Sequence, residues 1–175
     1  MDKKFEGSGK LVCANGDIYE GEFQAGKFHG LGAMQRKNGD FYKGSYVQGL
    51  FHGKGTLKYQ GEIYEGSFVQ GFREGAGRMI YKDGSVYEGE FKRGKRSGYG
   101  VLKEDSVFYE GEFLDDLFEG QGVMRFTNLE EYKGSFSKGK FWGAGCLKTY
   151  NGDVYEGEFK DNLLEGLGLV LYKKW

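Results

Sequence analysis

Tyr19-Glu20-Gly21-Glu22-Phe23 recurs along the chain at a nearly constant spacing. The stretch returns unchanged three more times, and three related copies keep its tyrosine, its glycine and its final aromatic residue. Successive copies start 22 or 23 residues apart, a period typical of stacked supersecondary units. The fold can therefore be read from a single unit. The seven copies begin at Tyr19, Tyr42, Tyr64, Tyr87, Tyr109, Tyr132 and Tyr155.

Glycine recurs at five positions of the unit and accounts for 33 residues of the chain. One of these positions follows the pentapeptide by three residues, and in two repeats it holds Asp116 or Asn162 instead. Asp and Asn are the other residues that tolerate a left-handed backbone, so a tight turn is expected there. Glycine in a helix interior costs about 0.5–1 kcal/mol, so glycines at this density predict almost no helix.

Between the glycines the sequence alternates with a period of two. Tyr19, Gly21 and Phe23 fall on one face of a strand, and the two glutamates fall on the other. A second strand runs through a Gly-x-Gly pair to a position that is apolar in every copy, which predicts that this position is buried. Each unit is therefore a β-hairpin. The apolar position holds Leu11, Met34, Leu57, Met79, Leu102, Met124, Leu147 and Val170.

This unit resembles the MORN (membrane occupation and recognition nexus) repeat, and the resemblance covers essentially the whole chain. It implies an all-β fold: an elongated, gutter-shaped, single-layer antiparallel β solenoid of tandem hairpins, with aromatic and apolar residues on its concave side. Residues 1–18 form a leading half repeat. The chain contains no proline and no low-complexity linker, so residues 1–175 are expected to form a single repeat array.

Two aromatic positions of the unit recur along the array. Such residues can simply pack on one another and hold the hairpins together. In a single-layer gutter, however, the inner face is only half covered, which would leave an apolar trough open to a partner in the middle repeats. We therefore predict a noncatalytic scaffold or adaptor that binds an amphipathic helix or an extended peptide. The residues expected to line this groove are Tyr64, Phe68, Tyr87, Phe91, Tyr109 and Phe113.

A second hypothesis concerns the basic hairpin turn at Lys92, Arg93, Lys95 and Arg96. Each basic residue contributes about 1 kcal/mol near an anionic membrane surface, so this turn is a candidate contact for a phosphoinositide or another anionic lipid. Basic residues at exposed turns are also ordinary solubilising residues. Groove binding and headgroup binding differ in salt dependence, because only the second should weaken steeply as ionic strength rises.

The last strand, residues 167–175, is more apolar than its counterparts. A repeat array exposes an unpaired strand edge at each end unless the edge is capped. The segment is therefore expected to act as a cap or as an edge for a homodimer.

Composition and charge exclude several classes of function. The 25 basic and 26 acidic residues leave a net charge of −1, so no overall field recruits nucleic acid. No apolar run approaches 18 residues and no signal peptide is apparent, which predicts a cytoplasmic protein. The family resemblance implies association with a cytoskeletal or membrane-associated structure. Cys13 and Cys146 lie about six repeats apart and are expected to be free thiols.

Catalytic and metal-binding patterns are also absent. His29 and His52 occupy the same position in neighbouring repeats, too far apart for comfortable joint metal ligation. Glutamate pairs recur in most repeats and fit a solvated strand face better than acid and base catalysts. The Gly-x-Gly pairs lack the helix that a phosphate cradle requires. No cofactor, metal site or enzymatic activity is therefore predicted.

Overall fold

The computed structural model describes residues 4–173 and divides into two compact units. The N-terminal unit comprises the chain as far as Gly84 together with Phe91–Gly94. The C-terminal unit comprises Ser85–Glu90 and the chain from Lys95 onward. Of the predicted last strand, residues 174 and 175 lie outside the described part of the chain.

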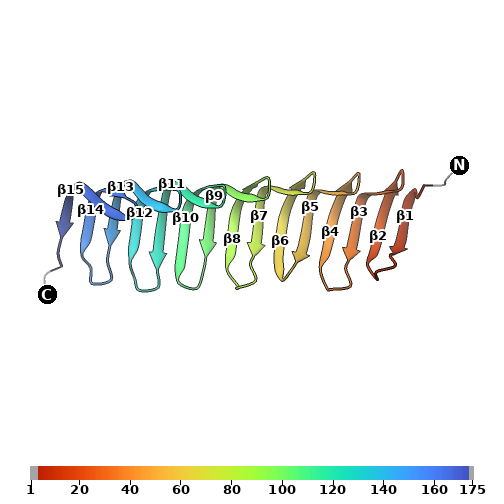
Figure 1. Ribbon diagram of the computed structural model, residues 1–175, viewed down its shortest axis with the longest axis horizontal. Coiled ribbons are helices and arrows are strands. Elements are labelled where there is room, and N and C mark those ends of the chain that lie inside the picture. The colour runs from red at the N-terminus through yellow and green to blue at the C-terminus, as the bar shows by residue number, and fades with distance from the viewer. Residues whose placement is uncertain (1–3, 174–175) are drawn as a thin grey trace. The chain divides into compact units, whose positions relative to one another are not determined.

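Fifteen strands between residues 4 and 173 form one sheet in which they follow one another in chain order (Figure 1). The pairings within each unit are antiparallel, and the described residues contain no helix. The predicted all-β, single-layer antiparallel architecture is thus confirmed. The strands are β1 (Gly7–Val12), β2 (Ile18–Gln24), β3 (Lys27–Gln35), β4 (Phe41–Val47), β5 (Leu50–Tyr59), β6 (Glu62–Val69), β7 (Phe72–Ile80), β8 (Val86–Lys92), β9 (Lys95–Lys103), β10 (Val107–Leu114), β11 (Leu117–Phe126), β12 (Glu131–Ser137), β13 (Lys140–Lys148), β14 (Val154–Lys160) and β15 (Leu163–Leu171).

The predicted tight turns are two-residue hairpin turns with both residues in the left-handed region. Ala25 and Gly26 have φ values of 50° and 79°, and Asp115 and Asp116 have 49° and 72°. This is the conformation of a type I′ turn, whose twist matches that of the flanking strands. The sequence pattern therefore located these turns correctly, including the one in which aspartate replaces glycine.

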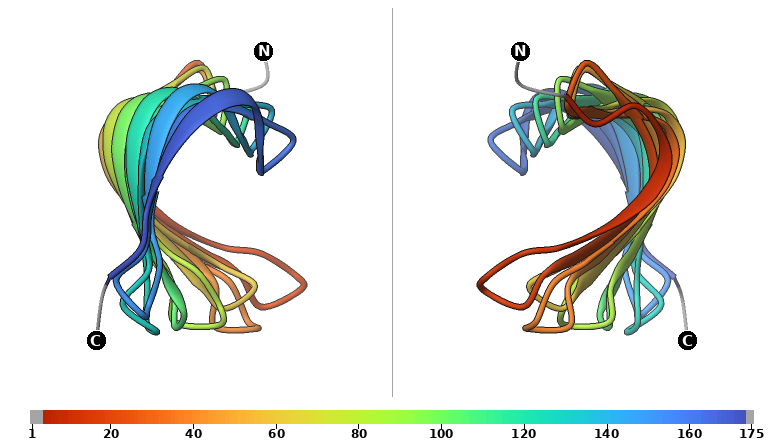
Figure 2. Two further views of the ribbon diagram at one scale, coloured as in Figure 1. Left: turned by 90° about the vertical axis from the view of Figure 1, so that its left-hand side faces the viewer. Right: turned by 90° about the vertical axis from the view of Figure 1, so that its right-hand side faces the viewer.

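Each hairpin bends where its two glycine positions meet. Gly21 pairs with Gly32, and the register then shifts so that Glu22 pairs with His29. Gly30 and Leu31 form the resulting bulge, with Gly30 at a φ of 58°. Bulges of this kind bend a strand and increase its twist. Within each unit the strands accordingly curve into an arc with a concave face, as the end-on views in Figure 2 show.

The tyrosine that opens each unit fills this bend. A Cβ atom added to Gly32 would lie 2.4 Å from the Tyr19 Oη atom, so the ring occupies the space that a side chain would need. The Tyr19 hydroxyl donates a hydrogen bond to the Glu22 carbonyl oxygen at 2.9 Å. Its ring also packs edge-on against Phe23 and Tyr46 of its own and the next repeat. Interleaved aromatic rings therefore build the core of each unit.

The second predicted core position is only partly buried. Met79, Leu102 and Met124 are buried, and the other five residues at this position are half-buried. The prediction that all eight would be buried was thus wrong for five of them, because aromatic rings take most of the fully buried positions. The half-buried residues are Leu11, Met34, Leu57, Leu147 and Val170.

Candidate functional site

One position of the repeat changes its chemistry in the middle of the chain. It is the second residue of the second strand of each hairpin, and its side chain packs on the tyrosine that opens the repeat. Phe51, for example, stacks on Tyr42 with ring centroids 3.8 Å apart and planes inclined by 13°. We call it the stacking position. It holds Phe28, Phe51, Arg73, Arg96, Phe118, Phe141 and Leu164.

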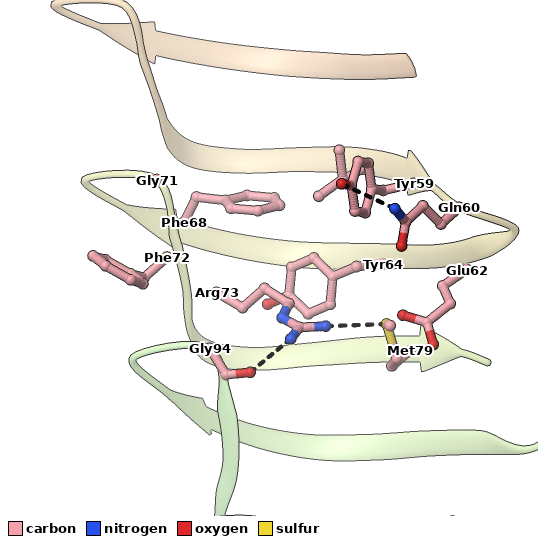
Figure 3. Close-up of a pocket in the computed structure, with 11 residues that line it drawn as sticks. Tyr59, Gln60, Glu62, Tyr64, Phe68, Gly71, Phe72, Arg73, Met79 and Gly94 are labelled. Carbon is pink, nitrogen blue, oxygen red and sulfur yellow. Dashed lines mark hydrogen bonds between the residues drawn. The ribbon is translucent and has the colours of Figure 1, made fainter. Parts of the chain in front are cut away.

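In the N-terminal unit, Arg73 takes the place of a phenylalanine. Its guanidinium lies over the Tyr64 ring at 5.8 Å and over the Phe91 ring at 5.5 Å, distances that allow cation–π attraction. The Nη2 atom donates to the Gly94 carbonyl oxygen at 2.8 Å, and Nη1 lies 3.4 Å from the Met79 sulfur. Figure 3 shows the guanidinium held beside Tyr64 by these two contacts.

In the C-terminal unit, Arg96 occupies the same position with a different electrostatic environment. It stacks over Tyr87 at 5.7 Å and over Phe113 at 5.3 Å. Its Nε atom lies 3.3 Å from the Asp116 carboxylate, and Nη2 donates to the Asp116 carbonyl oxygen at 2.8 Å. The residue that corresponds to Asp116 beside Arg73 is Gly94, which has no side chain. Within residues 4–173, Arg73 accordingly makes no ion pair.

A pocket of about 400 Å³ opens beside Arg73 in the N-terminal unit (Figure 3). Aromatic and aliphatic side chains line most of it, and Glu62 supplies an acidic group. Two aromatic side chains of its lining are well exposed, Tyr59 at 44% and Phe72 at 57%. The lining residues are Leu57, Tyr59, Gln60, Glu62, Tyr64, Phe68, Gly71, Phe72, Arg73, Met79 and Gly94.

The six rings predicted to line an open groove are buried instead. Their exposed fractions lie between 0% and 3%, because rings of adjacent repeats and the stacking-position side chains cover them. Tyr64 and Phe68 line the pocket beside Arg73 from within the core. The set is Tyr64, Phe68 and Phe91 in the N-terminal unit and Tyr87, Tyr109 and Phe113 in the C-terminal unit.

The accessible residues of the pocket were not found from the sequence. Arg73, Tyr59 and Phe72 lie outside the pentapeptide on which the prediction rested. The available signal was the loss of phenylalanine at the stacking position, where Arg73 and Arg96 break the repeat pattern. Such exceptions to a structural repeat are where binding chemistry is expected.

Burial keeps the pocket tyrosine neutral. It raises the pKa of Tyr64 to about 12, although the nearby Arg73 charge lowers it somewhat. A neutral ring under a guanidinium provides stacking and hydrogen bonding, and it is poorly suited to act as a base or a nucleophile near neutral pH. The pocket chemistry therefore fits binding.

The basic turn predicted to contact lipid is partly neutralised by its own chain. In the C-terminal unit, Lys95 lies 3.5 Å from an Asp115 carboxylate oxygen, and Arg96 pairs with Asp116. In the N-terminal unit, the side chains of Lys92 and Arg93 lie at the exposed end of a hairpin. These last two residues are the ones most available to an anionic surface.

Histidine and cysteine show no arrangement for a metal site. No group of three or more potential ligands capable of holding a metal ion occurs within the described chain. His29 and His52 are both half-buried. Cys13 and Cys146 are free thiols, as predicted. Burial, reinforced by Glu156 and Glu131, raises the pKa of the Cys146 thiol and so disfavours its reactive thiolate form.

Residues 4–173 include no helix long and apolar enough to cross a membrane. The last strand in the sheet order, β15, exposes several leucines, with Leu167 at 97% and Leu163 at 72%.

Comparison with known proteins places the repeat in a family. The MORN repeat family matches in eight segments: residues 1–18, 19–41, 42–61, 64–86, 87–103, 109–129, 132–154 and 155–175. No curated protein sequence matches the chain at a significant level. A solved structure described as the SAS-4 (dCPAP) TCP domain in complex with a proline rich motif of Ana2 (dSTIL), from Drosophila melanogaster, superposes with a TM-score of 0.46. It shares 13% identity, and the alignment covers 95% of this chain and 90% of that one.

Proposed function

Since the chain belongs to the MORN repeat family, we propose that it is a noncatalytic scaffold or adaptor that binds a protein segment on its concave face. The observation that carries this proposal is the pocket beside Arg73. It combines an apolar lining with exposed aromatic side chains, the residue types that most often anchor protein interfaces. A pocket of about 400 Å³ accommodates a few side chains of a partner segment.

The surface next to the pocket supports the same interpretation. Val47 and Leu50 flank one hairpin turn, and Val69 and Phe72 flank the next. All four are 40–57% exposed. Leu50 approaches the adjacent turn, since its Cδ2 atom lies 3.9 Å from a Cβ atom built on Gly71. These side chains extend the apolar surface from the pocket across two hairpin turns, which is more than a single side chain could contact.

An amphipathic helix or an extended peptide remains the proposed occupant. We also propose that the protein is located in the cytoplasm, at a cytoskeletal or membrane-associated structure.

The test uses side chains that are exposed, so that the core is preserved. The double variant Tyr59→Ser/Phe72→Ser should lose the proteins captured from a lysate by the unmodified chain. Tyr150→Ser is the matched control, because Tyr150 is a 72% exposed aromatic residue in a loop of the C-terminal unit. Circular dichroism should show all three proteins folded. Equal capture by the double variant would exclude the pocket as the binding site.

The alternative is a peripheral membrane or phosphoinositide-binding module that uses the basic turn. Its remaining support is the exposure of Lys92 and Arg93. Reversing these two charges should abolish vesicle binding under this alternative, and binding should weaken steeply with salt. Vesicle binding that is absent at low salt would remove the alternative.

A homodimer through the β15 edge is a further proposal. The exposed leucines of β15 would be covered by a second copy of the chain. Leu169→Lys should then shift a dimer to a monomer in sedimentation, whereas a chain that is monomeric before substitution would contradict the proposal.

A further inference from the structure

We infer that Arg73 binds a carboxylate of the partner, so that the segment taken by the pocket is apolar and carries one acidic side chain at the Arg73 end. This inference rests on the proposed function and specifies the chemistry of the partner. It depends on three features of Arg73: its lack of an acidic partner, its fixed orientation and its dispensability for packing.

The first feature is an unbalanced charge in a largely apolar setting. A cation removed from water is costly unless an anion or strong hydrogen bonds compensate it. Arg96 obtains this compensation from Asp116 at 3.3 Å, whereas Gly94 offers Arg73 only a carbonyl oxygen. Glu62 also lines the pocket but forms no ion pair with Arg73. A carboxylate supplied by a partner would give Arg73 the charge balance that Arg96 already has.

The second feature is the orientation of the guanidinium. Arginine carries five N–H donors in a plane, and within residues 4–173 Arg73 directs two of them to its own chain, toward Gly94 and Met79. Stacking over Tyr64 and Phe91 holds the plane in place. The remaining donors are thus pre-oriented beside the pocket, which lowers the entropic cost of binding a carboxylate through two parallel hydrogen bonds.

The third feature is that packing does not require a charge at this position. Phe28, Phe51 and Phe141 stack on the equivalent tyrosines with centroid distances of 3.7–3.8 Å. A phenylalanine at position 73 would therefore cover Tyr64 equally well. Because the neutral residue satisfies the fold elsewhere, the arginine is better explained by a ligand than by the core.

Glu62 sets the polarity of the proposed ligand. It lines the pocket on the Met79 side of the Arg73 guanidinium, whereas Gly94 lies on the other side (Figure 3). A second carboxylate close to Glu62 would be repelled, so the pocket favours a segment with a single acidic group near Arg73. Exposed Phe72 and Tyr59 would contact the apolar side chains of that segment.

The experiment selects random twelve-residue peptides on phage against the full chain. We expect selected peptides to combine apolar residues with an Asp or Glu. Changing that acidic residue to its amide should weaken binding by about 10- to 100-fold, the range for a hydrogen bond between charged groups. Arg73→Phe should weaken binding of the acidic peptide equally and leave the amide peptide unaffected. If Arg73→Phe folds poorly, Arg73→Gln replaces it in the same binding measurement, because glutamine keeps polar donors but removes the charge.

Arg96→Phe is the matched control and should leave peptide binding unchanged, because Arg96 already has an acidic partner. If Phe72→Ser weakens peptide binding but Arg73→Phe does not, the inference about Arg73 is wrong and the proposed function still holds. If no selected peptide is sensitive to Phe72→Ser, both fail. If Arg73→Phe abolishes binding to phosphoinositide vesicles and spares peptides, Arg73 is a lipid contact and the inference is overturned.

Discussion

At the scale of single residues, the tyrosine that opens each repeat explains two of the glycine positions. A Cβ atom on Gly111 or Gly122 would lie 2.5–2.6 Å from the Tyr109 Oη atom. The Tyr109 hydroxyl meanwhile donates to the Glu112 carbonyl oxygen. The ring can therefore lie flat across the paired strands only because both strands carry glycine beneath it. One tyrosine and two glycines form a single structural element of the repeat.

Tyr46 offers a test of this arrangement, because it replaces the phenylalanine found in the other repeats. Its hydroxyl is buried and has no hydrogen-bond partner in the described part of the chain. Removing a buried polar atom that lacks a partner should stabilise the folded state. Tyr46→Phe is therefore expected to raise the unfolding free energy by about 0.5–1 kcal/mol. Urea denaturation provides the measurement.

Tyr42→Phe is the matched control for that substitution. The Tyr42 hydroxyl donates to the Ser45 carbonyl oxygen at 2.9 Å, so its loss should destabilise the protein by about 1 kcal/mol. If both variants changed the unfolding free energy in the same direction, the distinction between an unsatisfied Tyr46 hydroxyl and a hydrogen-bonded Tyr42 hydroxyl would be wrong.

At the scale of the hairpin, backbone amides connect each repeat to the next. The Gly49 N–H, in one hairpin turn, donates to the Phe28 carbonyl oxygen of the preceding repeat at 2.8 Å. At the bulge, Glu22 accepts a hydrogen bond from the Leu31 N–H, and Glu112 does the same for Gln121. The second glutamate of the pentapeptide thus stabilises the bulge. The reading of these glutamates as a merely solvated face was incomplete.

The loops at the other end of the hairpins make a comparable connection. Asp40 is 6% exposed, and its carboxylate accepts hydrogen bonds from the Gln60 N–H of the next loop and from the Asn38 side chain. Asp40→Ala would leave these donors unsatisfied and should lower the unfolding free energy by about 2 kcal/mol. Thermal denaturation followed by circular dichroism measures the change.

Asp105→Ala is the control, because Asp105 is an exposed loop residue without such hydrogen bonds. Its expected effect is within about 0.5 kcal/mol. A loss for Asp105→Ala as large as that for Asp40→Ala would show that the connection between loops contributes little.

At the scale of the whole molecule, the same buried tyrosine recurs in both units and makes stability depend on alkaline pH. Burial raises the pKa of Tyr42, Tyr64 and Tyr132 to about 12. The pKa of Tyr109 is raised further in the same direction, also mainly by burial. The folded protein therefore holds the tyrosine protons more tightly than the unfolded chain does.

This difference predicts alkaline unfolding. The stabilisation is complete below pH 10, the ordinary tyrosine pKa, and is lost as pH rises from 10 toward 12. Tyrosinate absorbance and circular dichroism recorded during one pH titration should change together in this window. Ionisation of most tyrosines near pH 10 with the β-sheet signal intact would contradict the burial of these rings.

The sequence by itself determined the family, the hairpin repeat, the alternation of faces along each strand and the position of the turns. These features depend on local rules: alternation with a period of two, and glycine, Asp or Asn where φ is positive. Asp115 and Asp116 illustrate this, because the turn was located even without glycine. Such rules act within one repeat and need no knowledge of its neighbours.

Only the tertiary structure decided which side chains are accessible and which charges are matched. The aromatic positions were recognised, but their burial depends on rings of adjacent repeats, as Tyr64 shows with Phe91. Arg73 and Arg96 look alike in sequence, yet their environments differ because one packs near Gly94 and the other near Asp116, 21 and 20 residues away. Accessibility and charge pairing are properties of contacts between repeats, and the pattern within one repeat does not specify them.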